Sequence, residues 1–363
     1  MKLIRFGSPG HEKPGVLVEG VRRDLSAKFR DWDREFFEGD GAKRLADAVR
    51  GGAAAFPEVA EGERWGACIA RPGKVVCIGL NYKDHAREQG IDLPKEPVLF
   101  MKATNTVVGP YDDVLIPRLS KKTDYEVELG VVVGKRARYL DSPEQAREHI
   151  AGFCISHDVS EREFQIERSG QWTKGKSCDT FNPVGPFLAT PDEIADPHAL
   201  ELSLDVNGAR RQTGNTREMA VGVYALVHYI SQFMTLEGGD LISTGTPSGV
   251  GMSMKAAASS GIVLKFMGQG LGTALQRRNR AGKKPPMADL EESMRFDPDE
   301  GIADLDTHLD RLKSSAEAQG FKFDRHAARN ELQAATFGKR HRAIARLLLS
   351  PTGAMAIEVK PED

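Results

Sequence analysis

Apolar residues fall in short runs separated by glycine, proline and charged residues, a pattern that predicts a chain rich in β-strands. Helical patterns do not alternate regularly with these runs. This arrangement favours an α+β fold built on a mixed sheet over a doubly wound α/β fold. In the central part of the chain the predicted strands cover residues 75–78, 98–101, 127–133, 152–155, 202–206 and 241–243.

Helix starts are marked at two places by a hydroxyl residue followed by proline. Ser142-Pro143 and Thr190-Pro191 each precede Gln or Glu at the third helical position, which together resemble a capping box. A longer helix is predicted over 216–236, because the glycine pair that follows it can take the left-handed backbone conformation that ends helices.

The residue pattern of the sequence changes twice along the chain, which predicts three parts. Residues 1–70 read as a small strand-rich N-terminal lobe, 71–276 as the main domain, and 277–363 as a helical extension of unknown role that starts with a basic, proline-containing linker. In the extension, apolar residues recur at helical spacing (Ile302, Leu305, Leu309, Leu312). Asp324 is expected to cap a last helix that reaches Leu349.

Composition narrows the class of protein. Of 363 residues, 40% are apolar and 28% charged, which is enough for a packed core and excludes wholesale disorder. The formal net charge of −2 gives no basic field for a nucleic-acid partner. Apolar runs fall short of the roughly 20 residues that span a bilayer. The four cysteines form no C-x-x-C pair and are expected to be buried thiols, so we expect a cytoplasmic protein.

Two carboxylates in the strand predicted over 127–133 suggest a metal site. Side chains alternate between the faces of a strand, so Glu126 and Glu128 share one face while the neighbouring valines and leucine take the other. A cation between the carboxylates would relieve their repulsion. Oxygen donors select a hard ion, Mg²⁺ first and then Mn²⁺ or Ca²⁺. The alternative is an exposed face that is merely acidic.

Two further segments strengthen this interpretation. Asp158 ends an apolar strand, where it could be a third metal ligand or only a helix cap. If residues 81–89 are helical, His85 and Glu88 lie three residues apart on one face, within hydrogen-bonding reach. A carboxylate on one imidazole nitrogen leaves the other as a base near neutral pH. An ordinary surface ion pair is the alternative.

Taken together, the segments resemble the fumarylacetoacetate hydrolase family, from the first residue to about Gln276. The GQW…GKS…DTF form resembles most the branch that hydrolyses 2,4-diketo-3-deoxy sugar acids such as the rhamnonate derivative, whose members are often labelled ureidoglycolate lyase. The motifs that carry the resemblance are GLNYKDH (79–85), EPVLFMK (96–102), YEVELG (125–130), HDVSEREFQ (157–165), GQWTKGKSCDTF (170–181) and STGTPSGVGM (243–252).

The resemblance implies a fold and a set of roles. Residues 71–276 would be a metal-dependent catalytic β-roll domain, and the protein a homodimer. Glu126, Glu128 and Asp158 fall on the family's metal ligands, and His85 with Glu88 on a His–Glu pair carried by a lid. Lys176 falls on a buried lysine beside the metal. Arg162 and Gln165 fall on positions that contact the substrate or the metal ligands, and Gly245 and Thr246 on the turn whose hydroxyl and N–H groups meet the substrate carboxylate.

The expected activity is hydrolysis of the C3–C4 bond of a 2,4-diketo sugar acid to pyruvate and a second acid such as lactate. The 2-oxo acid would chelate the cation, and water activated by His85 would attack C4. Lyase, hydratase or decarboxylase action on a 2-oxo acid remains open, as does a metal-binding scaffold without catalysis. After Lys255 the sequence departs from the family pattern, although a closing strand over 262–266 can still form.

Overall fold

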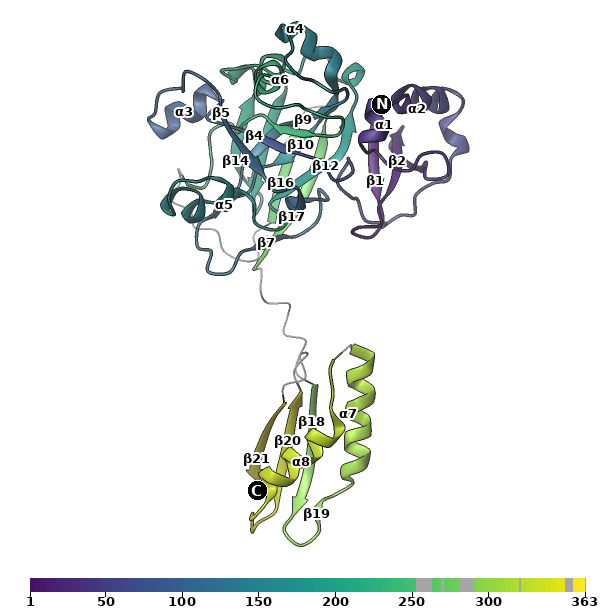
Figure 1. The fold of residues 1–363 in the computed structure, drawn as a ribbon, viewed down its shortest axis with the longest axis vertical. Coiled ribbons are helices and arrows are strands. Elements are labelled where there is room, and N and C mark those ends of the chain that lie inside the picture. The colour runs from purple at the N-terminus through teal and green to yellow at the C-terminus, as the bar shows by residue number, and fades with distance from the viewer. Residues whose placement is uncertain (253–262, 269–270, 281–289, 320, 350–354, 363) are drawn as a thin grey trace. The chain divides into compact units, whose positions relative to one another are not determined.

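The chain forms two compact units, Met1–Ala281 and Gly282–Asp363 (Figure 1). The structure is a computed structural model and describes residues 1–252, 263–268, 271–280, 290–319, 321–349 and 355–362. Both units combine sheets with a modest share of helix, which confirms the α+β prediction.

A large mixed sheet forms the centre of the first unit, and every predicted strand of the central part is present in the structure. Five of its strands come from segments that the apolar pattern identified. In spatial order the strands are β3 (Val21–Asp24), β2 (Lys13–Val18), β1 (Lys2–Phe6), β12 (Asn182–Ala189), β10 (Ile150–His157), β9 (Val127–Val133), β15 (Leu241–Ser243), β4 (Val75–Gly79) and β5 (Val98–Lys102); β6 (Val107–Val108) pairs with β12. The remaining predicted strand, 202–206, lies in the second sheet.

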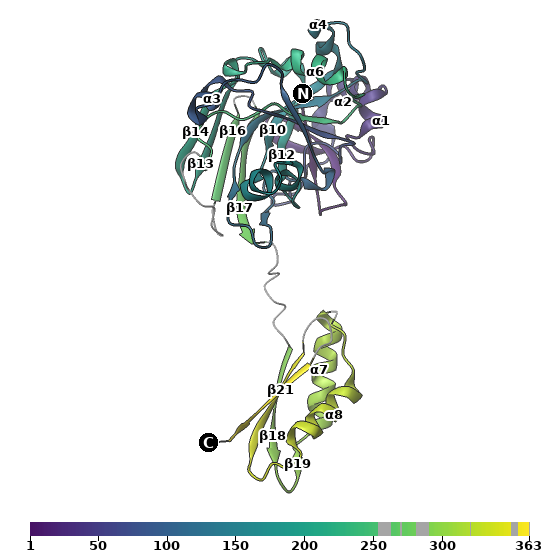
Figure 2. The same cartoon turned by 60° about the vertical axis from the view of Figure 1, so that its left-hand side comes forward.

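The second sheet covers one face of the first and belongs to the same unit (Figure 2). Its order is β14 (Ala209–Asn215), β13 (Glu201–Val206), β16 (Val263–Gly268), β17 (Gly272–Arg280) and β7 (Val114–Ile116). Residues 263–266 of the predicted closing strand are therefore present in β16, whereas residue 262 and residues 253–261 before it lie outside the described residues. A short ladder pairs β8 (Thr123–Asp124) with β11 (Ser160–Glu161).

Two hydrophobic cores lie on opposite faces of the large sheet. Along β9, Val127, Leu129, Val131 and Val133 enter the core shared with β13 and helix α6 (Val223–Ser231). Val132 enters the other core, together with residues of the N-terminal segment and helices α1 (Arg34–Glu38) and α2 (Gly41–Arg50). The even-numbered residues of β9, among them Glu128, thus lie opposite the aliphatic face, as the alternation predicted.

The N-terminal strands extend the large sheet instead of forming a sheet of their own. β1 pairs with β12 at Lys2↔Ala189 and Leu3↔Leu188, and β2 and β3 continue from it. Of the four cysteines, Cys68, Cys77 and Cys154 are buried, Cys178 is half-buried, and all four are free thiols.

The helix predicted over 216–236 is wrong in extent. A 3₁₀ turn occupies Thr216–Glu218, and α6 covers only Val223–Ser231. On each side of α6 a residue pairs with another segment instead of continuing the helix: Met219 bridges Tyr82, and Leu236 bridges Ala137. The elements that begin at the two proline-marked positions are short: one is helix α4 (Pro143–Ala146), and the other is a 3₁₀ turn (Pro191–Glu193).

The second unit contains the expected helices, α7 (Leu305–Gln319) and α8 (Arg325–Thr336), and also a sheet that the sequence analysis did not predict. The sheet runs β19 (Gly301–Ile302), β18 (Leu290–Asp297), β20 (Ala343–Leu349) and β21 (Met355–Pro361). Asp324 caps α8 as predicted, but the helix ends at Thr336 and does not reach Leu349.

The linker predicted at the start of residues 277–363 also differs from the prediction. Residues 277–280 belong to β17, and 281–286 lie outside the described residues. Among the helices of the described ranges, none has both the length and the apolar character needed to cross a membrane.

Candidate active site and metal centre

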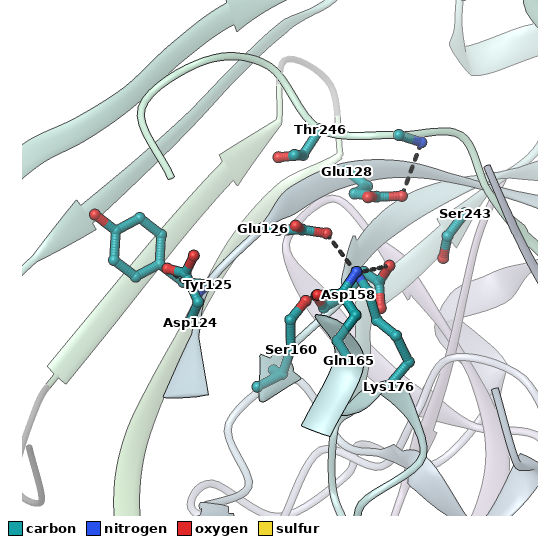
Figure 3. A network of polar contacts seen from close by, with 12 residues as sticks. Asp124, Tyr125, Glu126, Glu128, Asp158, Ser160, Gln165, Lys176, Ser243 and Thr246 are labelled. Carbon is teal, nitrogen blue, oxygen red and sulfur yellow. Dashed lines mark hydrogen bonds and ion pairs between the residues drawn. The ribbon is translucent and has the colours of Figure 1, made fainter. Parts of the chain in front are cut away.

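Three buried carboxylates meet where β9 and β10 lie side by side. The antiparallel register pairs Glu128 with Ser156, so two residues further on Asp158 lies opposite Glu126, and its N–H donates to the Glu126 carbonyl at 3.1 Å. One ligand oxygen from each of Glu126, Glu128 and Asp158 lies within 4.8 Å of the others (Figure 3). The predicted metal-ligand set is therefore brought together.

Three buried cations surround this cluster of acids. Lys176 Nζ donates to Glu126 Oε2 at 2.7 Å and to Asp158 Oδ2 at 2.6 Å (Figure 3). Lys102 Nζ donates to Asp158 Oδ1 at 2.5 Å, and an Arg162 amino group lies 2.7 Å from Glu126 Oε1. Each cation lowers the cost of burying the carboxylates, which would repel one another in the low-dielectric interior.

The surroundings shift the pKa values of the carboxyls in opposite directions. Burial, followed by the charges of Asp158 and Glu126, raises the pKa of Glu128 well above its usual value. Burial also opposes ionisation of Glu126, but the charges of Lys176 and Arg162 prevail and lower its pKa. Burial works against the ammonium of Lys176 too, yet Asp158 and Glu126 raise its pKa, so it stays protonated.

This donor set fits a hard divalent cation. All three ligands are carboxylates, the oxygen donors that Mg²⁺, Mn²⁺ and Ca²⁺ prefer. Burial and the neighbouring charges of Asp158 and Glu126 both disfavour the ionised form of Glu128, and a bound cation would offset both effects.

A cavity of about 200 Å³ opens beside the carboxylates. Its polar lining includes the three acids, Lys176, Arg162, Gln165, His85 and Thr246, and its apolar lining includes Leu80, Ile91, Phe100, Trp172 and Met252. Trp172 packs against Gly79, where a Cβ atom would lie 2.4 Å from the indole ring. The glycine of the motif at 79–85 thus makes room for the wall of the cavity.

His85 and Glu88 form the predicted pair on helix α3 (Lys83–Gln89). Their Nδ1 and Oε2 atoms are 3.3 Å apart, and His85 is buried and lines the cavity. The backbone N–H of Gly249 donates to Glu88 at 3.0 Å, and the Ser248 hydroxyl donates to Asp84 at 3.0 Å. These bonds tie the helix to the loop after β15.

The four predicted substrate-contacting residues lie around the same site. Arg162 bonds Asp124 and also donates to Gln165 Oε1 at 3.1 Å. The N–H of Gly245 donates to Glu128 Oε2 at 2.9 Å, and the Thr246 hydroxyl donates to the Val127 carbonyl at 2.9 Å. In this structure the Gly245 amide and the Thr246 hydroxyl are thus engaged by protein groups, and contact with a substrate stays a prediction.

Two residues of the site were not identified as site residues from sequence. Asp124 accepts hydrogen bonds from the N–H groups of Gly251 and Met252 and pairs with Arg162. Lys102 lies at the end of β5 with its side chain fully buried. A signal existed for each: Asp124 continues the every-second-residue spacing of Glu126, and Lys102 shares a strand face with buried Phe100.

Comparisons with known proteins agree with this architecture. The family described as Fumarylacetoacetate (FAA) hydrolase C-terminal matches residues 74–277. A protein of Burkholderia multivorans, whose name assigns it provisionally to the hydrolases, is 49% identical over 280 residues, covering 76% of this chain and 98% of that protein.

Among solved structures, the fumarylacetoacetate hydrolase of psychrophilic Exiguobacterium antarcticum is 34% identical with a TM-score of 0.66. The maleylpyruvate hydrolase of Sphingobium sp. SYK-6 is 26% identical with a TM-score of 0.65. Each of these alignments covers 77% of this chain and 100% of the other. The likeness confirms the expected fold, and nearly a quarter of this chain extends beyond the matched part.

Proposed function

The chain belongs to the fumarylacetoacetate hydrolase family, and from that premise we propose that it is a metal-dependent C–C bond hydrolase. Its substrate would be a 2,4-diketo acid of the acylpyruvate type. One observation carries the proposal: three buried carboxylates line the same cavity as His85, whose Nδ1 lies 3.3 Å from Glu88 Oε2. Such a cavity combines a cation site with a base that can activate water.

Glu126, Glu128 and Asp158 would hold the cation, with Mg²⁺ the first choice and Mn²⁺ or Ca²⁺ possible. When bound, a divalent cation supplies Lewis-acid polarisation of a 2-oxo acid that coordinates through its carboxylate and C2 carbonyl. The remaining steps follow from groups of the chain itself.

His85 is the proposed general base. With the Nδ1 proton held by Glu88, the unprotonated Nε2 can accept a proton from water. The resulting hydroxide adds to the C4 carbonyl, and the C3–C4 bond then breaks with its electron pair on C3. The His85 imidazolium then returns this proton to C3, which gives pyruvate, and C4 leaves as the carboxyl group of the second acid. Glu88 keeps the imidazole of His85 oriented both when it gains the proton and when it loses it.

Lys176 and Gln165 would act on the substrate from the same wall. The ammonium of Lys176 stays protonated beside Asp158, so its positive charge is fixed before negative charge develops on the pyruvate fragment. The Gln165 carbonyl accepts from Arg162, which leaves the amide N–H groups as donors for a substrate oxygen. Gly245 and Thr246 remain proposed contacts of the substrate carboxylate through the turn that they form.

The GQW…GKS…DTF motif favours a sugar-acid substrate, which would give lactate beside pyruvate in the rhamnonate case. The same cation site could also serve a lyase, hydratase or decarboxylase. Buried His85, oriented by Glu88, favours hydrolysis, since a decarboxylation requires no activated water.

Product analysis tests the proposal. The protein is incubated with Mg²⁺ and a panel of 2-oxo and 2,4-dioxo acids, and the products are identified by mass. Pyruvate with a second acid, formed only from 2,4-dioxo acids, supports the hydrolase. Carbon dioxide as the product would refute it in favour of a decarboxylase, and no turnover with any acid would refute catalysis on this class.

A further inference from the structure

Every carboxylate of the metal cluster has one oxygen held by a donor of the protein. Lys102 Nζ donates to Asp158 Oδ1 at 2.5 Å, and the Gly245 N–H donates to Glu128 Oε2 at 2.9 Å. The guanidinium of Arg162 lies 2.7 Å from Glu126 Oε1. Each acid has one further oxygen that none of these three donors holds.

Lys176 touches two of these further oxygens. Its ammonium bonds Glu126 Oε2 at 2.7 Å and Asp158 Oδ2 at 2.6 Å, so a positive charge already bridges the two acids (Figure 3), and Lys176 itself lines the cavity. Asp158 is therefore bound at both oxygens by ammonium groups, by Lys176 at one and by Lys102 at the other.

Lys102 differs from Lys176 in having no part in the proposed reaction. Its side chain is fully buried at the end of β5, and Nζ also donates to the Val159 carbonyl at 3.0 Å. Lys102 does not appear among the residues that line the cavity. Two short bonds and complete burial hold the ammonium against Asp158 Oδ1.

We propose that Lys102 is a positioning residue that restricts Asp158 to coordination through one oxygen and so favours Mg²⁺ or Mn²⁺ over Ca²⁺. The inference rests on the metal site of the proposed function. A carboxylate that binds through both oxygens needs both within bonding distance of the ion, and an ammonium on Oδ1 opposes this by occupying that oxygen and by repelling the cation.

The two classes of ion respond differently to this restriction. Ca²⁺ takes six to eight oxygens and often binds carboxylates through both atoms, whereas Mg²⁺ is usually held by one or two carboxylates and keeps several waters. Removing the ammonium should strengthen binding of either ion, because one positive charge is lost. Ca²⁺ alone should also gain Asp158 Oδ1 as a further ligand oxygen.

The test measures a ratio of affinities. Metal-stripped wild type and Lys102→Met are titrated calorimetrically with Mg²⁺, Mn²⁺ and Ca²⁺ under identical conditions. The variant is expected to shift the ratio of Ca²⁺ to Mg²⁺ affinity toward Ca²⁺ by about tenfold, which is roughly 1.4 kcal/mol. A ratio unchanged within about twofold would overturn the inference, even if both affinities rise.

A second substitution separates denticity from charge. Asparagine at 158 offers a single oxygen, so Lys102→Met should not shift the ratio in the Asp158→Asn background. A shift of the same size in both backgrounds would contradict the proposed mechanism, since it could not come from the second oxygen of Asp158.

A crystal structure of the wild type with Ca²⁺ provides a check that does not depend on the folding of any variant. We expect Asp158 to contact the ion through Oδ2 alone, with Lys102 on Oδ1; Asp158 bound through both oxygens would refute the inference. If the wild type binds none of the three ions, the metal site and the proposed function are both refuted. This result differs from an unchanged affinity ratio, which refutes only the role of Lys102.

Discussion

Replacing Lys176 by methionine should reveal how much the buried ammonium stabilises the carboxylate cluster. The side chain is 2% exposed and touches Glu126 and Asp158 at 2.7 and 2.6 Å. Removing one partner of a buried ion pair typically costs about 3–5 kcal/mol, because the remaining charge is left uncompensated. We expect the free energy of unfolding of Lys176→Met to fall by about this amount in EDTA.

Mg²⁺ should reverse much of this loss. A divalent cation between the acids replaces the missing charge, and a ligand at 100 times its Kd stabilises the folded state by about 2.7 kcal/mol. Because the ammonium also repels a cation, the variant should bind Mg²⁺ more tightly than the wild type. The difference in unfolding free energy between variant and wild type should therefore be smaller in Mg²⁺ than in EDTA.

Urea titration followed by tryptophan fluorescence measures this effect in the first unit alone. The three tryptophans, Trp32, Trp65 and Trp172, all belong to Met1–Ala281. Lys174→Met is the matched control, since Lys174 is exposed on the same short helix, α5 (Thr173–Lys176), and surface substitutions usually change stability by less than about 0.5 kcal/mol. A loss below about 1 kcal/mol for Lys176→Met in EDTA, or a loss unaffected by Mg²⁺, would refute the reasoning.

Three more predictions follow from the site and from the two units. His85→Asn should lower kcat by about 10²–10⁴-fold in assays of acylpyruvate hydrolysis, while calorimetry finds the Mg²⁺ affinity nearly unchanged; an equal loss of Mg²⁺ affinity would contradict the role of base. Because the pKa of Glu128 is raised, its contribution to the stability of the metal-free protein is full below its usual value of 4.5 and is lost as pH rises. The rise in Tm caused by Mg²⁺ should therefore be larger at about pH 8 than at about pH 5.5 in thermal scans, and the opposite trend would refute this assignment. A chain that ends at Ala281 should keep its fluorescence-detected unfolding transition and its activity, because relatives of this length align over their whole chains; loss of the cooperative transition would show that the second unit is needed for stability.

The local pattern of the sequence predicted the strands and the shared face of Glu126 and Glu128, because alternation along a strand depends only on neighbouring residues. It could not predict the register between β9 and β10. That register, Glu128 opposite Ser156, is what brings Asp158 against Glu126, and it depends on pairing between distant segments. The family resemblance supplied the ligand set that local reasoning had left open.

Other features were missed because tertiary contacts outweighed local propensity. Residues 343–349 are rich in alanine and leucine, which favour helices, yet they form β20 between β18 and β21 with every second side chain buried. Lys102 was passed over because a lysine at the end of an apolar strand reads as the boundary of that strand. Only the fold shows that its ammonium turns inward to Asp158.

The most direct test of the central claim is the position of a bound metal. In crystals grown with Mn²⁺, anomalous scattering should give one strong peak within about 2.0–2.6 Å of an oxygen from each of Glu126, Glu128 and Asp158. A peak that contacts none of these acids, or the absence of any peak at saturating Mn²⁺, would contradict the claim that they form one metal site.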